Sequence, residues 1–204
     1  MDEKSMAKVL EWGYDKALNG IPGCDSVSEL AEFYMRGNDS LENKVDQLIS
    51  WQRRKCFTSG FITGLGGLIT LPVAIPANIS SVLYVQIRMI AAIAYMGGYD
   101  VRDDRVKTMI YACLCGNSAK SIIRDAGIEI GKRLTMSVVR RIPGIAIQKI
   151  NSIVGFKLLT KFGEKGVVNL VKMIPVAGGI VGGIIDYTTA YLVGKTAKEL
   201  FIKR

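Results

Sequence analysis

One stretch decides the fold of this chain: CFTSGFITGLGGLITLPVAIPANISSVLYVQI (Cys56–Ile87). Its 32 residues include no charged side chain, and a membrane helix needs only ~20 apolar residues. Pro72 and Pro76 interrupt it, and because proline lacks an amide donor and disfavours helix in the residue before it, they predict a bend. We therefore expect an apolar hairpin of two helices, residues 57–69 and 77–95, which the other helices cover or which reaches a lipid surface.

The rest of the chain also shows the periodicity of helices, with capping signals before them and Gly or Pro after them. No segment alternates with period 2 between turns, so we expect no β-sheet. The further helices are expected at residues 4–18, 26–35, 39–54, 103–116, 118–130, 132–142, 145–162 and 173–200. The sequence thus predicts an all-α fold: a single helical domain around two long apolar helices that contain Gly and Pro. Residues 1–55 form a helical arm or cover, and residues 56–204 form the main domain.

The composition argues against an enzyme. Histidine is absent, which excludes His-based triads and His-ligated zinc. Cys113 and Cys115 lack the CxxC spacing, so we expect free buried thiols, no metal and no cofactor. Residues 64–69 lack the last Gly of a dinucleotide-binding loop, and Thr189 stands where a phosphate-binding loop ending at 194–196 would need Gly. We expect a protein without catalytic residues.

The charge is concentrated in the second half of the chain. Residues 1–101 have a net charge of −2 and residues 102–204 one of +11, and residues 132–172 hold nine Lys and Arg against one Glu. Basic helices with aliphatic faces favour an anionic lipid surface. Nucleic acid is disfavoured, since few aromatic rings lie between the basic residues, and a merely solvated basic face is the remaining alternative. The expected lipid contacts are Lys132, Arg133, Arg140, Arg141 and Lys149.

The N-terminal residues are charged and amphipathic and contain no apolar core of a signal peptide. We therefore expect a cytoplasmic protein, peripheral on the inner face of the cytoplasmic membrane, and non-enzymatic. Two alternatives stay open: an integral membrane hairpin, and a regulatory or adaptor module that contacts only proteins.

A polar stripe crosses the second apolar helix. Asn78, Ser81, Tyr84 and Arg88 fall within about a third of its circumference, at ~100° per residue. On the last helix, Asp186 follows small residues that let two helices approach closely. Because an unpaired buried charge is very costly, we expect Arg88 and Asp186 to form a buried pair.

Four motifs carry a resemblance to a known family. They are Gly66-Gly-Leu-Ile-Thr-Leu-Pro72, Gln86-Ile-Arg88 with the apolar residues after it, Gly98-Tyr-Asp100, and Ile174-Pro-Val-Ala-Gly-Gly-Ile-Val-Gly-Gly183 followed by Asp186. Over roughly residues 50–204 the chain resembles the EcsC family of bacterial proteins. The resemblance implies a cytoplasmic, largely helical protein. The namesake of the family is associated with a two-component ABC transporter, so an accessory role to a transporter, with a transporter subunit as protein partner, is implied as well.

Overall fold

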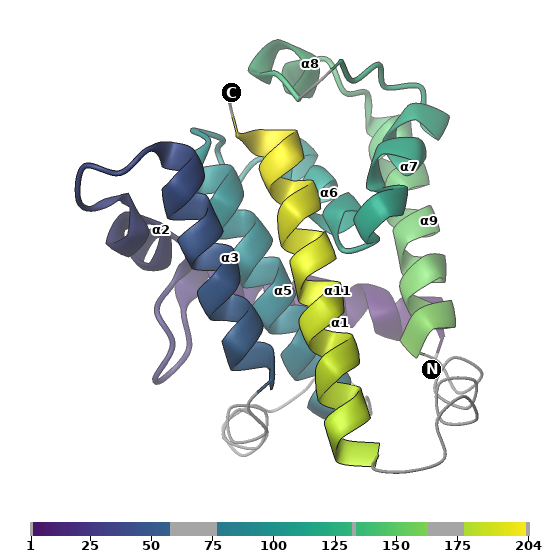
Figure 1. Cartoon of the computed structure of the whole chain (residues 1–204). Coiled ribbons are helices and arrows are strands. Elements are labelled where there is room, and N and C mark those ends of the chain that lie inside the picture. The colour runs from purple at the N-terminus through teal and green to yellow at the C-terminus, as the bar shows by residue number, and fades with distance from the viewer. Residues whose placement is uncertain (1, 58–76, 132–133, 163–177, 203–204) are drawn as a thin grey trace.

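A computed structural model describes residues 2–57, 77–131, 134–162 and 178–202, without the side chains of 55–57, 77–78 and 178–187 (Figure 1). In this part of the chain every regular element is a helix, and the only β-pairing is an isolated bridge between Ile21 and Cys24. The predicted all-α fold is therefore confirmed. The elements are α1 (Glu3–Asn19), α2 (Val27–Met35), α3 (Leu41–Phe57), α5 (Ala77–Met96), α6 (Asp104–Cys113), the 3-10 helix η1 (Gly116–Ser118), α7 (Ala119–Asp125), α8 (Met136–Arg140), α9 (Gly144–Phe162) and α11 (Gly178–Phe201).

Helix α5, the second half of the expected hairpin, is the centre of the body. Helices α1, α2, α3, α6 and α11 all pack against it. Within the described residues, Ile79–Met96 is the one helical window long and apolar enough to cross a membrane, and 94% of this window is buried inside the protein. Its hydropathy is therefore accounted for by its place in the core, since a helix that is apolar all round needs neighbours on every side.

The three N-terminal helices begin at capping residues. Ser26 and Glu29 form the capping box that the sequence predicts at α2, and the Ser40 hydroxyl accepts the amide of Asn43 at the start of α3. Buried residues of these helices belong to the same apolar cluster as those of α5. Residues 1–55 thus pack directly on the central helix; the domain division after residue 55 stays a prediction.

Two helices between α6 and α9 are shorter than predicted. Helix α7 ends at Asp125 because Gly127 adopts φ 83°, and the amide of Ile128 then donates to the carbonyl of Ile123. The helix expected over residues 132–142 is reduced to α8, which begins where the Thr135 hydroxyl accepts the amide of Val138. The chain here therefore contains one short helix of five residues and not a long amphipathic helix.

Helix α11, the second long apolar helix, lies close to α3 and α5. A Cβ atom on Gly194 would lie 2.9 Å from two side-chain carbons of Ile49, and one on Gly97 would lie 2.5 Å from the carbonyl oxygen of Phe201. Glycine at these two positions thus lets α3 and the α5–α6 turn approach the last helix.

The body has two distinct ends (Figure 1). One carries α8 and the C-terminal end of α11. At the opposite end lie the C-terminal ends of α3 and α9 and the N-terminal ends of α5 and α11. The chain therefore leaves the described body before residues 58–76 and before 163–177 at the same end, away from α8. The predicted helix 57–69 and the bend at 72–76 lie outside the described residues.

Candidate functional site

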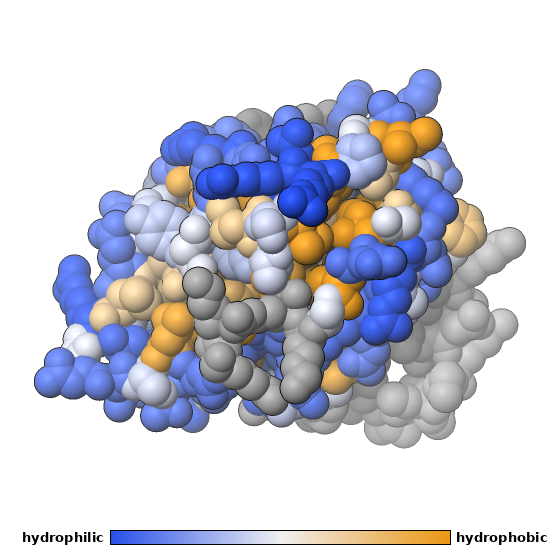
Figure 2. Space-filling view, turned by 90° about the horizontal axis from the view of Figure 1, so that it is seen from above, coloured by the Kyte–Doolittle hydropathy of each residue, from blue (hydrophilic) through white to orange (hydrophobic). Residues whose placement is uncertain are grey.

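The end that carries α8 combines basic and apolar exposed side chains. Arg140 and Arg141 are both exposed and make no ion pair within the described part of the chain. Met136 is 37% exposed and Ile145, in the first turn of α9, is 76% exposed. Figure 2 looks down on this end and shows apolar atoms lying between hydrophilic ones. Two guanidinium groups thus lie close in sequence to apolar side chains that contact water.

This end is fixed to the body by three hydrogen bonds. The Tyr99 hydroxyl donates to the carbonyl of Leu134 at 2.6 Å, and the Leu134 amide donates to the carbonyl of Leu200 at 3.0 Å. Arg105 Nε donates to the carbonyl of Ile142 at 3.2 Å. Because Leu134 and Ile142 are also buried, the segment between them is held at both ends, and its arginines project from a fixed backbone.

The other predicted lipid contacts are placed differently. Lys149 is exposed on α9, and its Nζ donates to the carbonyl of Asp125 at the last residue of α7. A cation there stabilises the C-terminal end of a helix. Lys132 and Arg133 lie outside the described residues. The structure therefore leaves Arg140 and Arg141 exposed at the end that carries α8 and gives Lys149 a contact with α7.

The predicted polar stripe of α5 lies in the core. Ser81 and Tyr84 are buried, and the Tyr84 hydroxyl has no hydrogen-bond partner among the described residues. Burial raises the pKa of Tyr84 to about 12, so this hydroxyl stays protonated at neutral pH. The side chain of Asn78 lies outside the described residues.

Arg88 is the largest fully buried side chain of this stripe, with 1% of its surface exposed. Its Nε donates to the carbonyl oxygen of Asp25 at 2.7 Å, and a terminal nitrogen lies 3.6 Å from the Asp25 carboxylate. Asp25 belongs to the turn between α1 and α2, so Arg88 connects that turn to the central helix. The side chain of Asp186 lies outside the described residues, and the Arg88–Asp186 pair stays a prediction.

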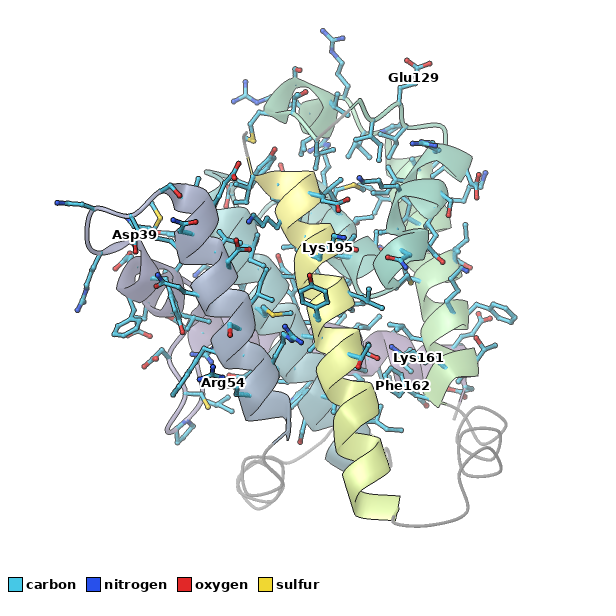
Figure 3. The ribbon with its side chains drawn as sticks, in the orientation of Figure 1. Asp39, Arg54, Glu129, Lys161, Phe162 and Lys195 are labelled. Atoms are coloured by element: carbon cyan, nitrogen blue, oxygen red, sulfur yellow. The ribbon has the colours of Figure 1, made fainter. Side chains whose placement is uncertain are left out.

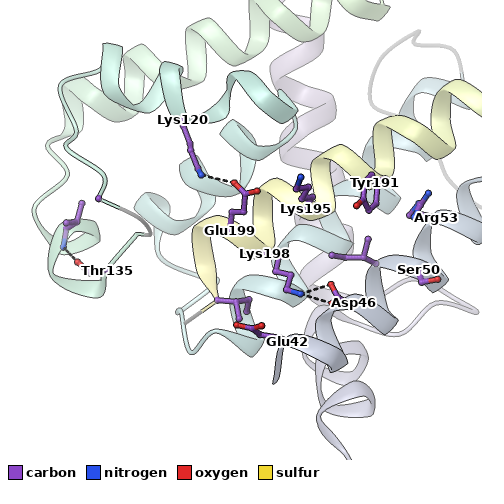
Figure 4. A pocket seen from close by; sticks show the side chains of 14 residues that line it. Glu42, Asp46, Ser50, Arg53, Lys120, Thr135, Tyr191, Lys195, Lys198 and Glu199 are labelled. Atoms are coloured by element: carbon purple, nitrogen blue, oxygen red, sulfur yellow. Dashed lines mark hydrogen bonds and ion pairs between the residues drawn. The ribbon is translucent and has the colours of Figure 1, made fainter. Parts of the chain in front are cut away.

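Sequence reasoning missed a groove between α3 and α11 (Figure 4). Its volume is about 1210 Å³, and residues of α7 and α8 line its far side. Lys198 Nζ lies 2.7 Å from each carboxylate oxygen of Asp46, and Lys120 Nζ lies 2.7 Å from the carboxylate of Glu199. Two ion pairs thus cross the groove.

One part of the groove is cationic. The Arg53 guanidinium lies 4.4 Å from the centre of the Tyr191 ring, and Lys195 follows one turn later on α11. Lys195 is exposed and has no partner among the described residues. The i, i+4 spacing of Tyr191 and Lys195 was the signal that the sequence offered, but the sequence does not show that α3 lies beside them.

The sequence model of the EcsC protein family matches residues 9–204. The chain belongs to the EcsC protein family. The match begins within α1, so it includes helices that the sequence analysis assigned to an arm. The chain is also similar to the uncharacterized protein YdbA of Bacillus subtilis (strain 168), with 29% identity over 71% of this chain and 50% of that protein. The chain thus spans about half the length of this curated relative. No solved structure matches.

The cysteines of this EcsC protein that the structure describes are free thiols. Cys113 is buried, and Cys24 and Cys115 are partly buried. Burial raises the pKa of the Cys113 thiol well above its usual range and that of Cys115 to about 11. Cys56 lies outside the described side chains. Within the described residues no three Cys, Asp or Glu side chains are grouped so that they could hold a metal ion.

Proposed function

We propose that this EcsC protein is a non-enzymatic helical protein that binds anionic membrane surfaces reversibly, through the end that carries α8. The observation that carries the proposal is the pair Arg140 and Arg141, exposed and without an ion pair in the described residues, close in sequence to an isoleucine that is 76% exposed. Basic and apolar side chains on one surface are typical of proteins that lie on lipid headgroups. The expected setting is the inner face of the cytoplasmic membrane.

The magnitudes fit a reversible attachment. Each Lys or Arg near an anionic leaflet contributes ~1 kcal/mol, so Arg140 and Arg141 together contribute about 2 kcal/mol, roughly a 30-fold change in affinity. Burying an isoleucine side chain fully is worth about 1.5–3 kcal/mol. Ile145 is 76% exposed, so most of its apolar surface would leave water if it entered the headgroup region. We expect this partial burial to contribute about 1–2 kcal/mol to binding.

The test is co-sedimentation with vesicles of neutral phosphatidylcholine, with and without anionic phosphatidylglycerol, at low and high salt. The parent should bind the anionic vesicles and release them in high salt, because the Debye length falls from ~10 Å at 0.1 M to ~3 Å at 1 M. The variant with Arg140→Gln and Arg141→Gln should bind about 30-fold more weakly. The matched control is Lys4→Gln with Lys8→Gln, which removes the same charge from exposed positions of α1.

Glu129 supplies a test of opposite sign. It is exposed at the end that carries α8 (Figure 3), and a carboxylate there repels an anionic surface. Glu129→Gln should therefore strengthen binding to anionic vesicles by a few-fold, about 1 kcal/mol or less. Equal binding of the parent to neutral and anionic vesicles, or equal losses in the arginine variant and the control, would contradict the proposal.

A second candidate is attachment through the opposite end, as an integral or inserted hairpin. The observation that favours it is the gathering there of the ends of α3, α5, α9 and α11 (Figure 1), with the charge-free residues 58–76 joining two of them. This alternative predicts membrane attachment that resists both salt and carbonate and does not respond to the Arg140 and Arg141 changes. Absence of binding to any vesicle would favour the protein-only adaptor, with a transporter subunit as the partner to examine first.

A further inference from the structure

Helix α9 has one face packed on the body and one face open to water. The packed face contacts α1, α6 and α7. Four residues on the other side fall within about 60° of the circumference, at ~100° per residue, and we call them the α9 stripe: Ile145, Ser152, Phe156 and Leu159. Ile145 is 76% and Phe156 56% exposed. A surface helix normally presents polar residues to solvent, so two large apolar side chains on this face indicate contact with another molecule or surface.

The charge of α9 indicates the chemistry of that surface. The helix contains Lys149, Lys157 and Lys161 and has no Asp or Glu in its sequence. The exposed Arg124 and Asp125 at the end of α7 cancel each other in charge. A helix that combines lysines with exposed Ile and Phe side chains complements an anionic lipid surface, because the apolar groups enter the headgroup region while the cations remain near the lipid phosphates.

We infer that α9 lies flat on the anionic membrane surface, with the α9 stripe among the lipid headgroups. The inference rests on the proposed function and extends its contact from the α8 end along one side of the body. Arg141 lies three residues before Gly144, where α9 begins, and Figure 1 shows α9 running from the α8 end toward the opposite end. Phe162, its last residue, lies at that far end in Figure 3. Because Ile145 and Phe156 are about 16 Å apart along the axis of one helix, a single plane contacts both.

A second copy of the chain would be a poorer occupant of the α9 stripe. Two such faces would bring two sets of three lysines together, and like charges across an interface oppose association. The exposed Ser152 also separates Ile145 from Phe156, whereas the core of a protein–protein interface is apolar and depleted of charge. A headgroup layer accepts both polar and apolar side chains.

The experiment compares two phenylalanines of similar exposure on opposite sides of the body. Phe156→Ser should weaken binding to vesicles that contain phosphatidylglycerol about fivefold, because about half of this side chain would leave water on binding. The matched control is Phe33→Ser on α2, which is 61% exposed and lies across the body from α9 (Figure 1), and it should change binding less than twofold. Ser152→Leu adds an apolar group to the α9 stripe and should strengthen binding a few-fold.

Fluorescence gives a second readout that depends on position. Phe156→Trp and Phe33→Trp each add one tryptophan to the native Trp12 and Trp51, whose signal in the parent is the baseline. Brominated phosphatidylcholine in the anionic vesicles should quench the added fluorescence of Phe156→Trp and leave that of Phe33→Trp unchanged. Because Phe33 and Phe156 are both exposed, their variants should keep the fold, which circular dichroism checks.

The outcomes separate the inference from the proposed function. Equal binding of Phe156→Ser and Phe33→Ser together with equal quenching overturns the inference, and the proposed function stands if the variant with Arg140→Gln and Arg141→Gln still binds more weakly than its own control. Quenching of Phe156→Trp with no response to the arginine changes overturns the contact at the α8 end and keeps the one along α9. A parent that binds no vesicle overturns both. A lipid-free dimer that Phe156→Ser dissociates in sedimentation equilibrium would assign the α9 stripe to a second copy and overturn the inference.

Discussion

Replacing Arg88 should reveal how much the buried guanidinium contributes to the stability of the fold. Arg88 lies in the middle of the central helix with 1% of its surface exposed. Its contacts in the described part of the chain are the carbonyl oxygen of Asp25 at 2.7 Å and the carboxylate of the same residue at 3.6 Å. That carboxylate belongs to a side chain that is 70% exposed. Arg88 is therefore buried, whereas the carboxylate next to it is largely hydrated.

Three substitutions separate the contributions. Arg88→Ala removes the buried stem and the donor to the Asp25 carbonyl, and we expect a loss of about 3–5 kcal/mol in the free energy of unfolding, mostly from the cavity. Arg88→Met keeps most of the volume and removes a charge that is costly to bury, so we expect a loss of only about 1–2 kcal/mol. Asp25→Asn weakens an ion pair that water screens on one side, and should cost less than about 1 kcal/mol.

The assay is urea unfolding followed by far-ultraviolet circular dichroism, with equal slopes required before the free energies are compared. The expected order of destabilisation is Arg88→Ala, then Arg88→Met, then Asp25→Asn. A loss below about 1 kcal/mol for Arg88→Ala would refute the burial of Arg88 in a packed core. A loss for Asp25→Asn as large as that for Arg88→Ala would show that the exposed carboxylate, and not packing, dominates the energy.

Two further predictions concern packing and the thiols. Gly194→Ala should destabilise the protein by about 1–3 kcal/mol, because the new Cβ atom would lie 2.9 Å from side-chain carbons of Ile49. Gly155→Ala on α9 is the control: its Cβ atom would meet nothing within 4 Å, so it should stabilise the protein by about 0.5–1 kcal/mol. Thermal unfolding measures both, and equal effects would contradict the close approach of α3 and α11. At pH 8 a thiol reagent should modify Cys24 before Cys113, because burial raises the pKa of the Cys113 thiol and keeps it in the unreactive protonated form. Peptide mass mapping follows the order of modification. Early modification of Cys113 would contradict its burial.

The helices were predictable because their signals are local. The capping box of α2 and the apolar composition of α5 each lie within one element, so the sequence alone located both. The predictions over 118–130 and 132–142 were too long. Helix α7 ends just before a glycine of positive φ. The residues around α8 are held by the Leu134 carbonyl, which accepts from the Tyr99 hydroxyl, and by the Leu134 amide, which donates to the carbonyl of Leu200. Helical periodicity in the sequence carries no information about such long-range hydrogen bonds.

The candidate sites were predictable to different degrees for the same reason. Arg140 and Arg141 follow one another in the sequence, so this basic pair could be located without knowledge of the fold. The partner of Arg88 in the described residues is 63 positions away, and the two ion pairs that cross the groove join residues 152 and 79 positions apart. Neither the Asp25 turn nor the groove has a local pattern, because each is created when distant helices pack.

The predicted pair between Arg88 and Asp186 can be tested by a double-mutant cycle. Helix α11 packs against α5, and a guanidinium has five N–H groups, more than the contacts to Asp25 occupy. If Asp186 is a buried partner, Asp186→Asn should cost about 3–5 kcal/mol in the parent. Arg88→Met should then cost as much, well above the 1–2 kcal/mol expected from the Asp25 contact alone, because it would strand the Asp186 carboxylate. Combining both changes would remove the stranded charge, so the coupling energy should exceed about 2 kcal/mol, whereas effects that add within about 0.5 kcal/mol would place Asp186 elsewhere.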